Sequence, residues 1–298
     1  RDIATDVDDT CIDIRASNVT LDGDGHKIWH DDFGELSIYE AIEVTSVSNV
    51  TVRDLTLTDW ELGVFVENVD DVRFDGVTAR NGEQAIRTFR GGGTIDLRRV
   101  TVRNGSEAMP AVSVRSDAEQ VTAANLSVSD AGTVGLDVGG VLSNGPTSGN
   151  VTIADTTIRG TPTDGISVRA EGDVSAENVT VRDAGTVGLN LSVPVGNASV
   201  ADALIDGAAT GIRASASGTV TNTTTRDTVT TLWVSESTVV SADDLTVGGN
   251  SVAPTTLSFT ARTNASSRVE VSSPERLVEP PERNRSVFRF VDVAVGAG

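Results

Sequence analysis

A repeat of about 20–26 residues runs along most of the chain and constrains its fold more than any other feature. One unit, GISVRAEGDVSAENVTVRD from Gly165, contains three short stretches in which apolar residues alternate with Ser, Thr or charged residues. Alternation over three to five residues is typical of strands that bury one face. About eleven such units follow one another, and none has the length or the caps of a helix. A unit this short cannot enclose a core alone, so the units must stack.

Three strands per unit, joined by short bends, do not form hairpins and instead predict a coil whose equivalent strands stack in parallel. We therefore predict an all-β chain, a single-stranded parallel β-helix of about ten to eleven turns with three short strands per turn. Neighbouring turns would lie about 4.8 Å apart, which gives a rod roughly 50 Å long.

The bends support this fold independently. When the units are aligned, the residue before the third strand is Gly, Asn or Asp in nearly every unit, and these residues tolerate left-handed backbone. Arg99 is the exception, and we expect local distortion there. A second column of the same kind ends the third strand. The first column comprises Gly23, Asp54, Gly76, Arg99, Asn125, Asp155, Asn178, Asp202, Asn222 and Asp244; the second comprises Asp59, Asn81, Asn104, Asp130, Gly160, Asp183, Gly207, Asp227 and Gly249.

Alternation also separates inward from outward residues in the first strand of each unit. Pairs such as Ile42/Val44 and Ile166/Val168 are expected to stack as aliphatic ladders that fill the core. The outward column between them is expected to comprise Asp13, Glu43, Phe65, Arg87, Ser113, Asp137, Ser167, Asn190, Arg213, Trp233 and Ser258.

Charge and composition exclude several classes of protein. The net charge is −20, from 43 acidic against 23 basic residues, and there is no basic run, so we expect no nucleic acid partner. No apolar stretch approaches the roughly 20 residues that span a bilayer. One cysteine and two histidines exclude a disulfide scaffold and a cysteine or multi-histidine metal centre. Lys27 is the only lysine, and this acidic, arginine-rich composition favours a halophilic protein.

Two segments interrupt the repeat, and a third follows it. The segment 29–40, WHDDFGELSIYE, is an insert that contains a Trp and the only Tyr, and the segment 139–149 is a loop rich in Gly and Ser. We assign residues 1–272 to the β-helix. Residues 273–298 are assigned to a proline-rich linker and a C-terminal strand, VFRFVDVAV, which is one candidate to cover an end of the rod.

The runs CIDIRASNVTLDGDGHKI, NVTVRDLTLTDWELGVFV and NVTVRDAGTVGLNL make the chain resemble the NosD-like parallel β-helix repeat proteins, within the pectin-lyase-like superfamily. The resemblance covers about residues 1–272 and implies a right-handed coil. It also implies a secreted or surface-anchored protein of haloarchaeal type. The wider group contains carbohydrate-binding proteins and sugar hydrolases, so a carbohydrate-related role is what the resemblance implies.

Acidic residues of the outward column are candidates for catalysis. Asp13 and Glu43 occupy adjacent turns about 5 Å apart, within the range that glycoside hydrolysis requires of two carboxyl groups. Arg87 follows in the same column, and lyases of the superfamily combine a calcium-binding acid cluster with an arginine base. The alternative is that these side chains are simply solvated.

The insert is the stronger candidate for a ligand-binding surface. Trp29 and Tyr39 offer rings that can stack on sugar faces, and Asp31 and Asp32 offer oxygen ligands for Ca²⁺, the one metal we consider; no other cofactor is expected. The alternative is a packing flap. His26 is expected at a bend and Trp60 in the packed interior.

Asparagines in N-x-S/T motifs are candidates for glycosylation if the protein is secreted. Asn18, Asn49, Asn150 and Asn197 precede the second strand and are the preferred sites. Asn125, Asn178 and Asn222 belong to the first bend column and are expected to be inaccessible.

The sequence thus favours an extracellular or cell-surface β-helix glycoprotein with a structural, adhesive or carbohydrate-contacting role. Its expected partners are glycans, other surface proteins or further copies of the chain in a multimer or filament. A calcium-dependent polysaccharide lyase or glycoside hydrolase is one alternative, and a glycan-binding viral or appendage spike is another.

Overall fold

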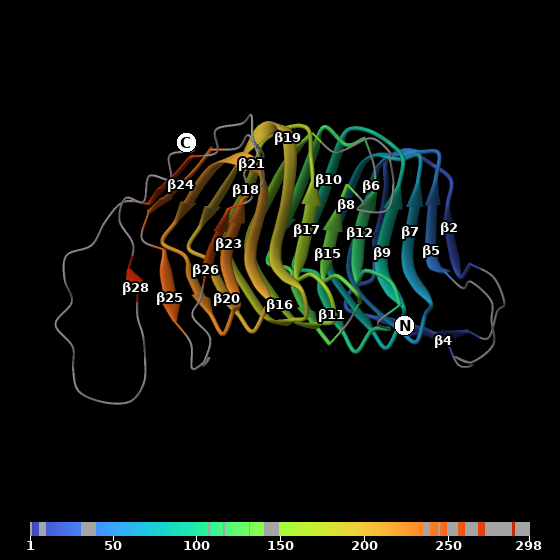
Figure 1. Cartoon of the computed structure of the whole chain (residues 1–298). Coiled ribbons are helices and arrows are strands. Elements are labelled where there is room, and N and C mark those ends of the chain that lie inside the picture. The colour runs from blue at the N-terminus through green and yellow to red at the C-terminus, as the bar shows by residue number, and fades with distance from the viewer. Residues whose placement is uncertain are drawn as a thin grey trace.

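A computed structural model (Figure 1) describes residues 2–5, 10–30, 40–106, 108–115, 117–130, 132–139, 149–234, 239–243 and 245–248, and the backbone of 256–259, 268–271 and 288–289. These residues form a β-helix, in which the chain winds around one axis from β2 at one end to β25 at the other. The number of turns roughly matches the prediction.

The strands form three stacks, which we call the first, second and third faces, and several long strands bend from one face to the next. The first face contains β2 (Ile12–Ile14), β5 (Glu40–Thr45), β7 (Leu62–Glu67), β9 (Gln84–Phe89), β12 (Val112–Arg115), β15 (Leu136–Val138), β17 (Ile166–Arg169), β19 (Val187–Ala201), β21 (Thr210–Thr221), β23 (Thr230–Val234) and β26 (Thr256–Phe259).

The second face continues from the first around a corner. It contains β3 (Val19–Asp22), β6 (Ser48–Thr58), β8 (Asp70–Arg80), β10 (Thr94–Arg98), β13 (Gln120–Ala124), β16 (Asn150–Thr161), β18 (Val174–Ala184), the later parts of β19 and β21, β24 (Val239–Asp243) and β27 (Arg268–Val271).

The third face closes each turn. It contains β1 (Ile3–Thr5), β4 (Lys27–His30), the later parts of β6, β8, β16 and β18, together with β11 (Thr101–Arg103), β14 (Ser127–Ser129), β20 (Leu204–Asp206), β22 (Thr224–Arg226), β25 (Thr246–Gly248) and β28 (Phe288–Arg289). Neighbouring strands pair in parallel except β28, which pairs antiparallel with β25. Phe288–Arg289 belongs to the segment VFRFVDVAV, and the assignment of residues 273–298 to a linker and a C-terminal strand stays a prediction.

The core is the aliphatic ladder that the alternation predicts. Ile42, Val44, Val64 and Val66 on successive turns are at most 1% exposed, and the ladder continues through Leu191. Aromatic residues reinforce it at two places. Phe74 is fully buried, and Trp60 lies inside the corner after the third face, where its Nε1 donates to the carbonyl of Ile28 at 3.3 Å. The expected packing of Trp60 is therefore confirmed.

The corners confirm the two predicted columns over the described residues, with one correction. Every predicted position from Asp54 to Asn222 and from Asp59 to Asp227 has a positive φ. The correction is Gly23, where the bend is instead made by Asp24 and Gly25, with φ of 48° and 75°. Asp244 and Gly249 lie outside the described residues.

Arg99 does not distort the coil as we expected. It adopts the same left-handed backbone as its neighbours, with a φ of 51°. For a residue with a Cβ, the left-handed backbone conformation is less stable than the right-handed one by about 1–2 kcal/mol. The guanidinium of Arg99 is bonded to Asp75 at 2.7 Å and lies 3.7 Å from Asp54, both on preceding turns. These contacts with acidic side chains offset the strain and hold the corner.

Small residues at the start of the first face have a steric cause. A Cβ added at Gly165 would lie 2.8 Å from the carbonyl oxygen of Gly188 and 2.4 Å from a methyl carbon of Val181. At such turns the chain enters the first face through a position too crowded for a side chain, which explains the recurrence of Gly there, whereas Ala41, Ala85 and Ala111 show that other turns accept a Cβ at the same position.

The predicted insertions fall largely outside the described residues. Of the insert 29–40 the structure describes Trp29, His30 and Glu40, and of the loop 139–149 it describes Gly139 and Gly149. The boundary at residue 272 stays a prediction. Within the described part of the chain, no helix is long and apolar enough to cross a bilayer.

Candidate functional site

The predicted outward column of the first face is confirmed, because strand pairing places its members on consecutive turns. It divides into three chemically different parts: an N-terminal part, a covered centre and a polar, aromatic C-terminal part. In order it comprises Asp13, Glu43, Phe65, Arg87, Ser113, Asp137, Ser167, Asn190, Arg213, Trp233 and Ser258.

The N-terminal part holds the three residues predicted for catalysis. Asp13 and Glu43 are paired on adjacent turns, as expected. Arg87 is separated from Glu43 by the turn that carries Phe65, and its guanidinium lies 5.8 Å from the centre of the Phe65 ring. The carboxylate of Asp13 is bonded to Arg15 on its own strand. The structure therefore brings the two acids together but not the arginine, and a catalytic role for the three stays a prediction.

The centre of the column is buried although its side chains point outward from the coil. Ser113, Asp137 and Ser167 are only 1–3% exposed. Arg115, two positions after Ser113, places its Nη2 3.8 Å from the Asp137 carboxylate. The Ser113 hydroxyl and the Arg115 Nε have no hydrogen-bond partner among the described residues. Alternation along a strand predicts which way a side chain points but not whether other residues cover it, so this burial was not foreseen.

The C-terminal part joins four polar or aromatic side chains on successive turns. Asn190 donates from Nδ2 to Oδ2 of Asp164 at 2.8 Å. On the next turn the guanidinium of Arg213 lies 5.0 Å from the centre of the Trp233 ring. Burial raises the pKa of Asp164, while the bond from Asn190 and the charge of Arg213 oppose that rise. Arg213 is exposed and Trp233 half-buried, so this part remains open to solvent.

Sequence reasoning placed Asn190, Arg213 and Trp233 in the column but missed Asp164. Asp164 lies at the corner just before the first face, one position ahead of Gly165. Its carboxylate reaches an amide on the next turn, and such diagonal contacts do not follow from two-residue alternation. The only signal is an acid between Val134 and Val187, which hold the same position on the two neighbouring turns; Glu40 is another acid in this column.

The predicted ligand surface of the insert is described only in part. Trp29 lies on β4 with the Lys27 ammonium 4.9 Å from the centre of its ring. Asp31, Asp32 and Tyr39 lie outside the described residues. His26, as expected, lies at a bend, where its Nδ1 is 3.1 Å from Asp2.

The four preferred glycosylation sites are exposed at the corner before the second face. Asn49 donates from Nδ2, the atom that a glycan would join, to Asn18 at 2.9 Å. Their glycosylation stays a prediction. The expectation that Asn125, Asn178 and Asn222 are inaccessible is wrong, because all three are exposed. The corner residues point outward, and Asn178 donates to the Asp155 carboxylate at 2.6 Å.

Calcium binding stays a prediction as well. Among the residues that the structure describes, no three His, Cys, Asp or Glu side chains converge so that they could hold a metal ion. The acids predicted as calcium ligands, Asp31 and Asp32, are not among those residues.

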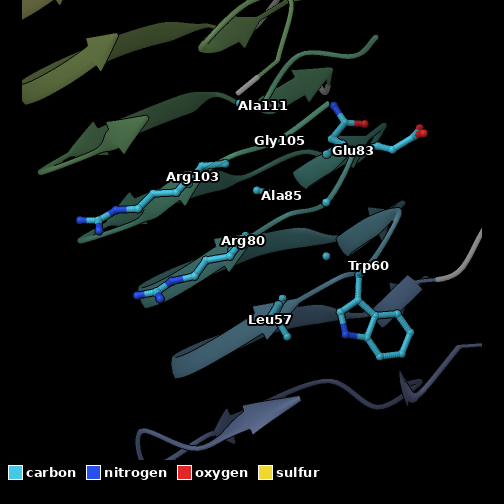
Figure 2. Close-up of a pocket in the computed structure, with 13 residues that line it drawn as sticks. Leu57, Trp60, Arg80, Glu83, Ala85, Arg103, Gly105 and Ala111 are labelled. Carbon is cyan, nitrogen blue, oxygen red and sulfur yellow. The ribbon is translucent and has the colours of Figure 1, made fainter. Parts of the chain in front are cut away.

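A small cavity lies at the corner between the third and first faces, lined by Leu57, Trp60, Arg80 and Arg103 among others (Figure 2). Its volume of about 10 Å³ leaves room for roughly one water molecule. It cannot admit a sugar, so the candidate contact surface is the open part of the first face.

The comparisons with known proteins concern the fold. The family model described as "Right handed beta helix region" matches residues 40–205. A structural match at a TM-score of 0.48 and 10% identity is the catalytic domain of a GH87 alpha-1,3-glucanase variant in complex with nigerose. The match covers 84% of this chain and 57% of that chain, so this chain spans little more than half of that domain. No curated protein sequence matches the chain.

Proposed function

Because the chain belongs to the right-handed β-helix family, we propose that it is an extracellular or cell-surface protein that contacts carbohydrate along the C-terminal part of its first face. The observation that carries this proposal is the series Asp164, Asn190, Arg213 and Trp233, which occupies successive turns on one open surface.

The chemistry of this series suits a sugar. The Asp164 carboxylate accepts hydrogen bonds, the Asn190 amide both donates and accepts, and the Arg213 guanidinium presents several donors in a plane. Sugar hydroxyls need this mixture of donors and acceptors. The Trp233 ring adds an apolar surface on which a sugar face can stack, with Arg213 holding the ring in place. Parallel turns fix the spacing of these groups at about 4.8 Å.

The geometry supports contact rather than cleavage. Glycoside hydrolysis uses two carboxyl groups on opposite sides of the bond, about 5–9.5 Å apart. The described part of the series contains one carboxylate, Asp164. The nearest acid of the outward column, Asp137, has a side chain only 4% exposed and lies 3.8 Å from the Arg115 guanidinium. It is therefore closed to a ligand in this arrangement.

The composition supports an extracellular, salt-rich setting as part of the same proposal. A net charge of −20 generates strong self-repulsion in dilute buffer. At molar salt the Debye length falls to about 3 Å, so this repulsion is screened. The rod itself would serve as a stiff support that displays the contact surface.

The test is binding of the whole chain to an array of neutral and acidic oligosaccharides, followed by titration of the best ligand with tryptophan fluorescence. Trp60 is buried and should not respond, whereas Trp233 should. Trp233→Ala is expected to weaken binding by about 10–30-fold, as expected for loss of an aromatic anchor.

Trp29→Ala is the comparison variant, since Trp29 is half-buried under a lysine in a similar way. Circular dichroism checks that both variants keep the β-helix. Absence of binding to every oligosaccharide would overturn the proposed function. Loss of binding in Trp29→Ala, with binding kept in Trp233→Ala, would overturn the proposed location.

A further inference from the structure

The third face carries a row of arginines that the proposed function does not use. Strand pairing places them in one outward column, with Ser129 and Asp206 in the intervening turns. We call this row the arginine stripe; it comprises Arg80, Arg103, Arg159, Arg182 and Arg226. All five side chains are exposed. Within it, Arg80 pairs with Arg103 and Arg159 with Arg182 on adjacent turns, and Figure 2 shows Arg80 and Arg103 extended in the same direction.

Arginines on the second face behave differently, because Arg53, Arg73 and Arg98 each have an acidic partner. Arg53 is bonded to Asp22 at 3.0 Å, Arg73 to Asp75 at 2.7 Å, and Arg98 to Asp96 at 2.8 Å. Arg99 bonds to Asp75 as well. Carboxylates of the second face and its corner therefore neutralise these four arginines.

The stripe has almost no such neutralisation. Arg159 lies 3.4 Å from Asp183, but Arg80, Arg103, Arg182 and Arg226 are within ion-pair distance of no carboxylate among the described residues. The corners that follow the first pair carry Asn81 and Asn104 rather than aspartate. This is unexpected in a chain with 43 acidic residues, which has more than enough carboxylates to pair them.

Adjacent unpaired arginines are unfavourable for the free protein. The turns are about 4.8 Å apart, and like charges directly opposite each other on a sheet are destabilising. A bound anion removes that repulsion, and guanidinium groups bind carboxylate, sulfate or phosphate oxygens through paired N–H donors. The Arg80/Arg103 pair, in which neither guanidinium has a carboxylate partner among the described residues, is thus the place where an anion would bind most strongly. The Arg159/Arg182 pair comes second, because Arg159 already lies 3.4 Å from Asp183.

The surroundings of the stripe suit an extended chain. A parallel column two positions earlier on each strand presents hydroxyl groups, and Leu204 is its one apolar member between β6 and β22. The hydroxyl residues are Thr56, Thr78, Thr101, Ser127, Thr157, Thr180 and Thr224. Beside the second arginine pair an open hollow of about 380 Å³ lies over Gly160, Asp183 and Gly207, where small corner residues leave space.

We propose that the arginine stripe and the hydroxyl column beside it bind a linear anionic polysaccharide that carries carboxylate or sulfate groups and lies along the rod. This goes beyond the proposed function, since it concerns a different face and a ligand chosen by charge. A nucleic acid fits less well, because duplex DNA brings one phosphate charge per about 1.7 Å. That density exceeds the spacing of the stripe and would place phosphates against the acidic corners Asp130 and Asp183.

The experiment measures binding of the whole chain to three polymers with the same backbone: dextran sulfate, carboxymethyl dextran and neutral dextran. Biolayer interferometry is run at the lowest NaCl concentration that keeps the β-type circular dichroism signal, and again at higher salt. We expect binding to at least one of the charged polymers, none to dextran, and weakening as salt rises. The two charged polymers distinguish sulfate from carboxylate.

The variant Arg80→Gln/Arg103→Gln should weaken binding about tenfold, since each exposed ion pair contributes up to about 1 kcal/mol. The matched control Arg53→Gln/Arg98→Gln removes the same charge from the paired arginines of the second face and should bind as the unmodified chain does, provided circular dichroism shows that it is folded. If the control is unfolded, Arg15→Gln/Arg90→Gln replaces it, because it changes the net charge equally and both exposed arginines lie outside the stripe and outside the proposed contact surface.

Three outcomes would overturn the inference. They are absence of binding to both charged dextrans, equal weakening in the stripe variant and its folded control, and tighter binding of single-stranded oligo-dT than of the charged dextrans. Trp233→Ala should leave dextran sulfate binding unchanged, so failure of this inference and failure of the proposed function are separable.

Discussion

The interior of the β-helix changes character along its axis. Around Phe74, Ile86 and Leu97 the interior is mostly apolar and these side chains are fully buried, with Thr88 as a buried inward hydroxyl among them. Towards the C-terminal end threonines take such positions. Thr225 occupies the inward place that Val181 and Ile205 hold on the two preceding turns, and it is just as buried.

This difference shows that one coil geometry accepts two kinds of interior. Buried hydroxyls are tolerated where they find partners, and Thr225 donates to the Thr231 hydroxyl at 3.2 Å. Thr228 is 4% exposed, and its hydroxyl has no partner among the described residues. Since an inward threonine removes less apolar surface from water than the valine or isoleucine that it replaces, the C-terminal turns should be the less stable end of a rod whose turns contact only their neighbours.

The largest effect is expected from Phe74→Ala in the apolar region. Loss of this ring should reduce the local free energy of unfolding by about 3–5 kcal/mol, because a cavity remains. Val220→Ala, in the same inward column near the threonines, should cost about 2 kcal/mol. Hydrogen exchange measured by mass spectrometry resolves the two regions. Equal losses of protection in both would contradict the division of the core.

An intermediate effect is expected at the corners, which are alike in both regions. Asn178→Ala and Asn222→Ala each replace a left-handed asparagine and should each cost about 1–2 kcal/mol. Asn178→Gly is the control, since glycine keeps the left-handed backbone. Urea unfolding followed by circular dichroism measures the loss. A much larger cost at one of the two corners would show that the regions differ in their corners as well as in their cores.

The smallest effect is expected from Thr228→Val, and it has the opposite sign. Removal of an unpaired buried hydroxyl should raise stability by about 1 kcal/mol. Thr225→Val, a change of the same shape, should lower stability because it removes the partner of Thr231. Thermal melting of the two variants compares them directly. A stabilised Thr225→Val would mean that the hydrogen bonds of the threonine interior contribute nothing.

The corner columns show how far the sequence could be taken. Asp54, Asn125 and Asn178 were predicted to line up because only a few residue types favour the left-handed backbone, and this preference is local. The same preference failed at two positions. Arg99 adopts the left-handed backbone although arginine does not favour it, and at Gly23 the bend is made by the next two residues. Arg99 is held by Asp75 and Asp54 on other turns, so its conformation depends on contacts that no local preference encodes.

The candidate surfaces also contain features that the sequence could predict and features that depend on contacts between turns. The outward column was predictable, since period-two alternation and a fixed repeat place each residue on a face. The bond between Asp164 and Asn190 was not predictable, because it runs diagonally between turns. The arginine stripe was visible as a recurring Thr-x-Arg at the end of the third strand. Only the structure shows that Arg159 alone among its five arginines lies within ion-pair distance of a carboxylate of the described residues.

The sequence by itself determined the coil, its corners and the direction in which each side chain points, since all three follow from short-range preferences repeated at a fixed period. The tertiary structure decided which outward residues are covered, paired or left exposed. Ser113 and Asp137 point outward and are buried, whereas Arg80 and Arg103 point outward, are exposed and have no carboxylate partner in the described part of the chain. Coverage and pairing depend on the reach of side chains between turns, which alternation does not specify.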